Sequence, residues 1–254
     1  MLPCKVAESP GPSGMAASVS SSVAWPARIT RHSSPAWLIG SAAESWPGRT
    51  WTPPPELEAF LAAGPPPAFA GLGSMTPENA ARLSGVIAEA ARQAGTRVVI
   101  QAGRAGLTQH EDPPGQSILI GHVPHDWLFP RMAALVHHAG AGTTAAGLRA
   151  GVPAIGVPMI GDQPFWAARL AALGTGPRPI PLRRLTASAL AAALRDATGG
   201  SSYLDRARAL ATRIAGEDGA RPVIEALSRL SGRPRPEPGT RLSRPDGNDG
   251  SARR

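Results

Sequence analysis

The chain has 254 residues, a formal net charge of +8 and only 4% aromatic residues. Because the basic residues are scattered and aromatic rings are few, a nucleic-acid platform of stacked rings and cationic side chains is excluded. No apolar run approaches the roughly 18 residues of a membrane span, and residues 1–22 lack the apolar core of a signal peptide. Cys4 is the single cysteine, so no disulfide framework forms and we expect a reducing, cytoplasmic environment.

Both ends of the chain have compositions that predict disorder. Residues 1–22 form a head rich in Pro, Gly and Ser, and residues 231–254 form a basic tail with six arginines and three acidic residues. Residues 23–64 contain four of the six tryptophans. We interpret this segment as an interdomain linker anchored by its rings, with a short helix at 56–63. Stacking of the rings on a ligand is the alternative.

From residue 65 onward the sequence alternates strands and helices, which predicts an α/β domain with a doubly wound parallel sheet. Thr76-Pro77 carries an N-cap signal, and the helix after it is expected to end at Gly95. The first three strands are expected at residues 68–72, 96–101 and 117–120. Ligands of such sheets bind beyond the carboxyl ends of the strands. We therefore expect Gly73-Ser74, the segment His122 to His125 and the segment His137 to Thr143 to converge.

The most informative stretch is the turn His137-His138-Ala139-Gly140-Ala141-Gly142-Thr143-Thr144. It follows the apolar end of a strand and precedes an expected helix at 144–150 that Gly151 ends. A glycine-rich turn before a helix lets the backbone N–H groups approach an anion at the positive end of the helix dipole. A second strand at 153–158 then leads to Asp162-Gln163 and a helix that starts near Phe165. This turn is therefore a candidate anion-binding site.

Other interpretations of this turn compete with anion binding. Gly140-x-Gly142-x-x-Ala145 matches a loose dinucleotide fingerprint, but the expected acidic residue at the end of the next strand is absent. A P-loop is excluded because no Gly-Lys-Ser/Thr occurs. A small-residue turn that packs a helix on the sheet remains possible, although it does not explain two adjacent histidines. A metal site would use His122, His125, His137 and His138. We do not expect one, since neighbouring residues on a strand point to opposite faces.

Residues 137–177 resemble the donor-binding signature of nucleotide-sugar glycosyltransferases of the GT-B fold, family 1, and a weaker likeness extends from residue 23 to 230. The branch is that of bacterial and fungal sterol, macrolide and glycopeptide glycosyltransferases. The resemblance implies that residues 65–230 form the Rossmann-like C-terminal, donor-binding domain. Further helices are expected at 186–198, 203–215 and 219–230. In the family the last helix crosses back onto the N-terminal domain.

The resemblance also implies roles for individual residues around the diphosphate. His138 matches the family histidine that hydrogen-bonds the diphosphate, and Gly140, Gly142 and Thr143 match the contacts around it. Such fixed donors stabilise the leaving group electrostatically. No Asp-x-Asp motif is present, and neither a metal nor another cofactor is expected. The alternative for His138 is a histidine at a strand end that a backbone carbonyl satisfies.

The remaining donor contacts are implied at the base and the sugar. His122, Val123 and His125 occupy the base-binding position, where His122 takes the place of the stacking ring and Val123 that of the backbone contact. Asp162-Gln163 matches the acidic–amide pair that holds sugar hydroxyls. A helix cap at Asp162 is the other interpretation. Ala146 stands where the plant branch has a glutamate on the ribose, which leaves the nucleotide open.

The resemblance implies transfer of a hexose from a UDP-sugar, most simply UDP-glucose, to a hydroxyl of a lipophilic or natural-product acceptor, with inversion. In the family the general base is a histidine of the N-terminal domain. We find no such domain before Val23, so no catalytic residue is assigned and the isolated chain is expected to be inactive in transfer. A catalytically inactive binding fragment and the donor subunit of a two-chain enzyme are the alternatives. Expected partners are the donor and a separate acceptor-binding domain or chain.

Overall fold

The computed structural model of the chain describes residues 51–73, 75, 79–109 and 112–231. The predicted head, most of the predicted linker and the predicted tail lie outside the described residues, as do Ser74 and the Thr76-Pro77 cap. Among the helices that the described residues form, none combines the length and apolar character needed to cross a membrane.

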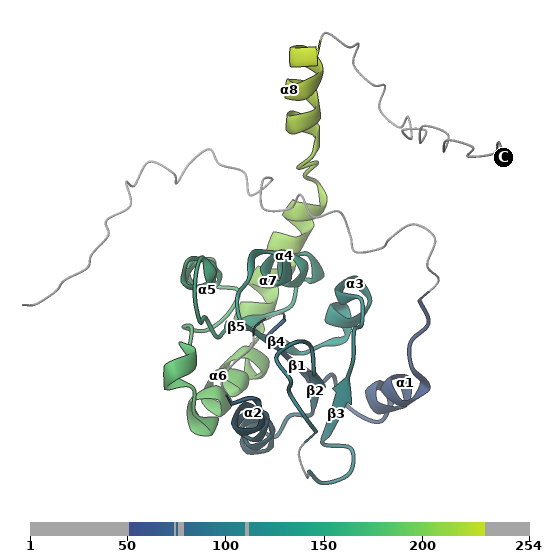
Figure 1. Ribbon diagram of the computed structural model, residues 1–254, viewed down its shortest axis with the longest axis vertical. Helices are drawn as coiled ribbons and strands as arrows, with labels where there is room; N and C mark the ends of the chain where they lie inside the picture. The colour runs from purple at the N-terminus through teal and green to yellow at the C-terminus, as the bar shows by residue number, and fades with distance from the viewer. Residues whose placement is uncertain (1–50, 74, 76–78, 110–111, 232–254) are drawn as a thin grey trace, which may run out of the picture. The chain divides into compact units, whose positions relative to one another are not determined.

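Five parallel strands form one sheet in the order β3-β2-β1-β4-β5 (Figure 1). β1, β2 and β4 carry buried residues throughout, as expected for strands covered on both faces. The predicted doubly wound parallel α/β fold is therefore confirmed. The strands are β1 (Ala68–Gly71), β2 (Val98–Gln101), β3 (Ser117–Ile120), β4 (Ala134–His137) and β5 (Ala154–Gly156).

Helices cover both faces of the sheet, and the apolar residues of each strand are divided between two core clusters. On one face, α2 and α6 pack against Val98, Ile100 and Ile155. On the other face, α1, α3, α4 and α7 pack around Phe69 and Val99. The helices are α1 (Pro55–Ala62), α2 (Ala80–Ala94), α3 (His125–Leu128), α4 (Ala141–Ala150), α5 (Gln163–Ala172), α6 (Ala187–Gly199), α7 (Ser201–Ala215) and α8 (Arg221–Ser231), with 3-10 turns at Phe129–Arg131 and Leu182–Arg184.

Several helix boundaries differ from the predictions. α4 begins at Ala141 rather than at Thr144, because Gly140 takes an extended N-cap conformation and its carbonyl accepts a hydrogen bond of 2.9 Å from the N–H of Thr144. α2 begins at Ala80, where the Asn79 side chain accepts a bond of 2.8 Å from the N–H of Arg82. The turn after β4 is therefore shorter than expected, and small residues predicted as turn belong to the helix.

The described part of the predicted linker packs on the domain. Leu57 of α1 is fully buried and Phe60 nearly so, both in the cluster around Phe69. Trp51 contacts Trp127 edge to face, with 5.0 Å between the ring centroids. Trp127 itself is partly buried against the same cluster. Residues 51–63 thus contribute to the core beneath the β3 side of the sheet.

Candidate functional site

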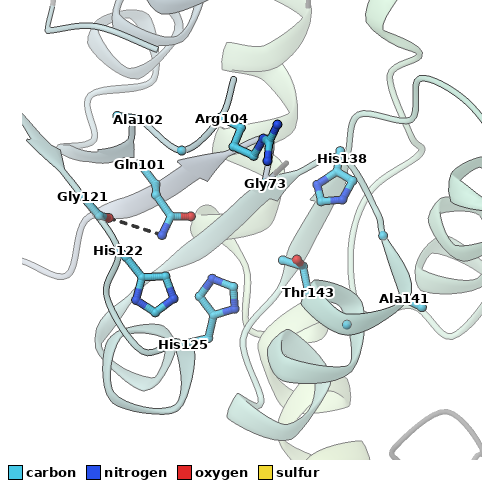
Figure 2. Close-up of a pocket in the computed structure, with 13 residues that line it drawn as sticks. Gly73, Gln101, Ala102, Arg104, Gly121, His122, His125, His138, Ala141 and Thr143 are labelled. Atoms are coloured by element: carbon cyan, nitrogen blue, oxygen red, sulfur yellow. Dashed lines mark hydrogen bonds between the residues drawn. The ribbon is translucent and has the colours of Figure 1, made fainter. Parts of the chain in front are cut away.

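A pocket of about 680 Å³ lies at the carboxyl edge of the sheet (Figure 2). Its volume falls in the range typical of small-molecule sites. Four strand ends contribute to it, because the loops after β1, β2, β3 and β4 all reach this edge. The predicted convergence of strand ends is therefore found. The lining residues are Gly73, Gln101, Ala102, Gly103, Arg104, Gly121, His122, His125, His138, Gly140, Ala141, Gly142 and Thr143.

The imidazole of His138 lies in a tight slot between two glycines. A Cβ atom at Gly140 would lie 2.4 Å from His138 Nε2, and one at Gly73 would lie 2.7 Å from His138 Cε1. Both distances are shorter than non-bonded atoms allow, so any side chain at either position would displace the ring. Gly73 also has a φ of +60°, which glycine adopts without a steric cost. The two glycines therefore fix where the His138 ring can be.

His138 is a neutral hydrogen-bonding group near pH 7. Burial lowers the pKa of His138, and the negative charge of Asp162 only partly opposes this effect. A neutral imidazole carries one donor and one acceptor nitrogen. Its Nδ1 atom is buried and has no partner among the described residues, so the predicted alternative of a carbonyl acceptor for this atom is not found there. His138 can thus act by hydrogen bonding rather than by net positive charge.

The N-terminus of α4 faces the same pocket. Gly140, the N-cap residue, has no side chain to bond the first amides of the helix, and Ala141, Gly142 and Thr143 line the pocket. The first amides of a helix have no partners within the helix and lie at the positive end of its dipole. No described contact would crowd a Cβ at Gly142, so the approach to these amides is open. The combination suits an anion.

The other side of the pocket carries two more imidazole rings. His125, at the start of α3, stacks on Phe129 with 4.3 Å between the centroids and an angle of 13° between the rings. It also contacts Phe69 edge to face at 6.1 Å. The exposed ring of His122 lines the pocket beside it (Figure 2). Val123, by contrast, is 2% exposed and packs in the core, so only its backbone remains available for the predicted contact.

Asp162 and Gln163 do not line the pocket. The carboxylate of Asp162 accepts a hydrogen bond of 2.7 Å from the indole N–H of Trp166, and it makes no cap bond to α5. Asp162 therefore occupies the N-cap position of α5, as the alternative predicted, but its side chain does not form the cap bond. The carbonyl oxygen of Gln163 accepts bonds from the N–H groups of Met159 (2.8 Å) and Ile160 (3.1 Å). Their predicted contacts to sugar hydroxyls remain predictions.

The pocket also contains residues that the sequence analysis did not assign to the site, and two of them, Gln101 and Arg104, have polar side chains. Gln101 ends β2, and its side-chain amide donates a long hydrogen bond of 3.4 Å to the carbonyl of Gly121. Arg104 lies in the exposed loop after β2 and has no hydrogen-bond or ion-pair partner among the described residues. The rule that strand carboxyl ends converge, applied to the second strand as well, would have indicated both residues.

His137 is fully buried and does not line the pocket. Its ring is 6.5 Å from that of His138 and nearly perpendicular to it. Of the two neighbouring histidines, only His138 lines the pocket. Within the part of the chain that the structure describes, no group of three or more His, Cys, Asp or Glu residues is arranged to hold a metal ion.

A doubly wound parallel sheet with a helix N-terminus and imidazole rings at its carboxyl edge is an architecture typical of nucleotide-binding α/β domains. Comparison with known proteins identifies the family. Residues 86–230 match the family model described as "Erythromycin biosynthesis protein CIII-like, C-terminal domain". The chain belongs to this family, whose members are C-terminal domains of family 1 glycosyltransferases.

Similar proteins come from bacteria, fungi and plants. The O-mycaminosyltylonolide 6-deoxyallosyltransferase of Streptomyces fradiae is 43% identical over 175 residues, which are 68% of this chain and 40% of that protein. The vancomycin aglycone glucosyltransferase of Amycolatopsis orientalis is 42% identical over 186 residues, 69% of this chain and 42% of that protein. A sterol 3-beta-glucosyltransferase of Arabidopsis thaliana is 40% identical over 177 residues, 70% of this chain and 28% of that protein. The chain thus spans less than half the length of these relatives.

The fold also matches solved structures. The crystal structure of the glycosyltransferase of kitacinnamycin superposes with a TM-score of 0.59 at 22% identity, covering 74% of this chain and 47% of that one. At this identity the likeness concerns the fold alone. It places the chain among GT-B folds, as the sequence predicted.

Proposed function

We propose that this chain binds a nucleoside-diphosphate sugar as the donor domain of an inverting family 1 glycosyltransferase. The observation that carries the proposal is the position of His138, held between Gly73 and Gly140 beside the open N-terminus of α4. Both features supply hydrogen-bond donors at one place, which is what a diphosphate leaving group needs. Family membership supports the same assignment.

In this proposal the diphosphate lies over the first turn of α4. The amides of Ala141, Gly142 and Thr143 and the Thr143 hydroxyl would donate to its oxygens, and His138 would add a neutral donor. Arg104 would add a cation from the loop after β2. As the bond from the anomeric carbon to the diphosphate breaks, charge grows on the leaving oxygen. Donors already in place then stabilise the transition state more than the ground state.

The nucleoside would extend toward the other end of the pocket. There, the exposed ring of His122 offers a surface on which a base can stack, and His125 is held behind it by Phe129. Among the relatives, a vancomycin aglycone glucosyltransferase and a sterol 3-beta-glucosyltransferase are named for glucose, whereas a third is named for a 6-deoxyallosyl group. We propose UDP-glucose as the donor, and dTDP-glucose is the alternative that these names leave open.

The acceptor and the general base are assigned to residues outside this chain. Transfer needs a base within hydrogen-bond reach of the acceptor hydroxyl, and the proposed ligand contacts already use the pocket histidines. The chain spans 40% of the 6-deoxyallosyltransferase and 28% of the plant sterol glucosyltransferase. We therefore propose that it supplies the donor half of the reaction. A donor subunit with a separate acceptor-binding chain and an inactive nucleotide-sugar-binding module share this chemistry.

Calorimetric titration of the purified 254-residue chain tests the proposal. The ligands are UDP, UDP-glucose, dTDP-glucose and UMP, in buffer that contains EDTA. We expect UDP and UDP-glucose to bind, and UMP to bind much more weakly because it lacks the phosphate that the donors recognise. Failure of every ligand to bind, or equal affinity for UMP and UDP, would refute diphosphate recognition.

A transfer assay separates the donor-half assignment from a complete enzyme. Labelled UDP-glucose is incubated with the same chain and a panel of sterol, macrolide and glycopeptide-aglycone acceptors. Because no residue of the chain is assigned as the base, we expect no transfer above the background of hydrolysis. Glycosylated product from this chain alone would contradict the assignment of the base to residues outside it.

A further inference from the structure

We infer that His137, which does not reach the pocket, is a positioning residue that holds His138 in place through the backbone of Ala139. The inference rests on the proposed function, because ligand binding is one of its readouts. His137 is the last residue of β4 and is fully buried. His138, the next residue, lines the pocket. Ala139 joins this histidine pair to the glycine that caps α4.

Ala139 has an unusual backbone conformation. Its φ is 61°, and it is the one non-glycine with a positive φ among the described residues. A Cβ atom disfavours this left-handed region, so surrounding contacts must hold the residue there. His137 provides such a contact, since its Nδ1 atom accepts a hydrogen bond of 3.0 Å from the N–H of Ala139. The bond joins the side chain of His137 to the backbone two residues further on, and the hydrogen-bonded loop so formed includes the backbone of His138.

The slot around His138 makes this backbone conformation important. The His138 ring lies so close to the two glycines that an added Cβ atom would be 2.4 Å from it at Gly140 and 2.7 Å from it at Gly73. The imidazole therefore has almost no room to shift. If Ala139 relaxed to a negative φ, the chain direction on both sides of it would change. The Cα of His138 and the position of Gly140 would then move relative to each other. A small change at Ala139 would therefore move the His138 ring away from the diphosphate position.

The chemistry of the His137 ring fits an acceptor role. Because Nδ1 accepts a bond, the neutral ring carries its proton on Nε2. That Nε2 atom is buried and has no partner among the described residues, which is unfavourable for a polar group. A leucine would fill a similar volume without an unpaired N–H. Burial also lowers the pKa of His137 to about 3, so Nδ1 stays unprotonated at ordinary pH. The favourable contribution of the ring is thus its bond to Ala139.

Two substitutions at His137 distinguish the effect of the hydrogen-bond acceptor Nδ1 from the effect of the imidazole ring as such. His137→Leu removes the acceptor and keeps an apolar side chain, whereas the side-chain carbonyl of His137→Asn can accept from the N–H two residues on. For His137→Leu we expect a loss of UDP affinity of about tenfold, the scale of one hydrogen bond in position, with little change in melting temperature. For His137→Asn we expect most of the affinity to be retained. Ala139→Gly in the His137→Leu background should restore binding, because glycine adopts a positive φ without a steric cost.

Several outcomes would overturn the inference. Wild-type affinity in folded His137→Leu would exclude a positioning role, and equal losses in the Leu and Asn variants would show that the acceptor is not the important feature. A crystal structure of His137→Leu should show that Ala139 has left the left-handed region, and a retained positive φ would contradict the inference even if wild type bound no UDP. If His137→Leu fails to fold, the nitrogen spectrum of the wild-type histidines decides. A protonated Nδ1 on His137 near neutral pH would refute the assigned hydrogen bond.

Discussion

The turns after β4 and β5 lie next to each other along the chain, and both were predicted to bind the donor. In the turn after β4, the first amides of α4 are uncapped by a side chain and the Nδ1 atom of His138 has no partner among the described residues. In the turn after β5, Gln163 bonds the N–H groups of Met159 and Ile160, and Asp162 bonds the indole of Trp166. The turn after β4 therefore leaves hydrogen-bonding groups without partners among the described residues, whereas the turn after β5 pairs its polar side chains internally.

The largest expected effect is a fall in the free energy of unfolding at low pH, which the histidines at the end of β4 cause. His137, the last residue of β4, has a pKa lowered from 6.5 to about 3, mainly by burial, and burial lowers the pKa of His138 as well. The unfolded chain therefore binds more protons than the folded chain below about pH 6.5, and stability falls as pH decreases through this range. Each unit of pKa difference corresponds to about 1.4 kcal/mol. Denaturant unfolding between about pH 7 and pH 4 measures the slope, and His137→Leu should flatten it. If the free energy of unfolding of that variant depends on pH as steeply as that of the wild type, His137 is not the source of the effect.

The next effect concerns ligand binding by the turn after β4. His138→Ala should lower UDP affinity about a hundredfold, because a hydrogen bond to a charged group is lost from a buried position. The fold should be retained, since the side chain lies at the pocket and not in either core cluster. Calorimetry with UDP and a circular dichroism melt measure the two quantities. UDP binding at wild-type strength would show that the turn after β4 is not the diphosphate site.

Gly140→Ala should affect the same turn by steric means. The new Cβ would lie 2.4 Å from His138 Nε2, so the ring must move and UDP affinity should fall at least about tenfold. Gly199→Ala is the matched control, because a Cβ there meets nothing within 4 Å and the residue ends α6 away from the pocket. We expect wild-type affinity in the control. Equal affinities in the two variants would mean that the slot around His138 does not control binding.

Asp162→Ala tests whether the turn after β5 also contacts the ligand. We expect UDP-glucose affinity to fall about tenfold while UDP affinity is unchanged, since the carboxylate is predicted to touch only the sugar. Trp166→Phe is the control, because it removes the indole donor bonded to Asp162 and keeps the carboxylate. If Asp162→Ala weakens UDP and UDP-glucose equally, or if Trp166→Phe reproduces its effect, the carboxylate acts only within its own turn.

Arg104→Gln should give the smallest effect. The side chain is exposed, so its attraction to a diphosphate is screened by solvent and salt. We expect a loss of UDP affinity of about twofold to fivefold at low salt and a shallower dependence of affinity on salt concentration. Titrations at several salt concentrations measure both. An unchanged salt dependence would place Arg104 outside the reach of the ligand.

The sheet was predictable because strand and helix signals alternate strongly from residue 65 onward. The convergence of His122, His138 and Thr143 on one edge followed from the parallel topology alone. The start of α4 was not predictable, since Gly142 is a weak helix former that is common in turns, and no Ser, Thr, Asp or Asn precedes Ala141 as a cap. Nothing in the sequence around Ala139 signals a positive φ, because that conformation depends on a tertiary slot and on the His137 bond.

The internal pairing of Asp162 and Gln163 was also beyond sequence reasoning. Both residue types bind sugar hydroxyls and both stabilise turns, so composition does not decide between the roles. The decision depends on where Trp166 and the amides of Met159 and Ile160 lie after folding. Arg104 was missed for a simpler reason, because the loop after the second strand carried no recognised motif.

The glycine slot also determines where this pocket can be redesigned. Gly73 and Gly140 tolerate no side chain without moving His138, so a mutagenesis library that varies them should consist mostly of variants with weakened UDP binding. Gly121, at the opposite end, has open space where a Cβ would be, and the neighbouring His122 is exposed. Random variation at Gly121 and His122 would therefore sample donor preference while the proposed diphosphate-binding end stays intact. The end of the pocket at Gly73 and Gly140 therefore accepts no substitution without moving His138, whereas the end at Gly121 and His122 has room for side chains.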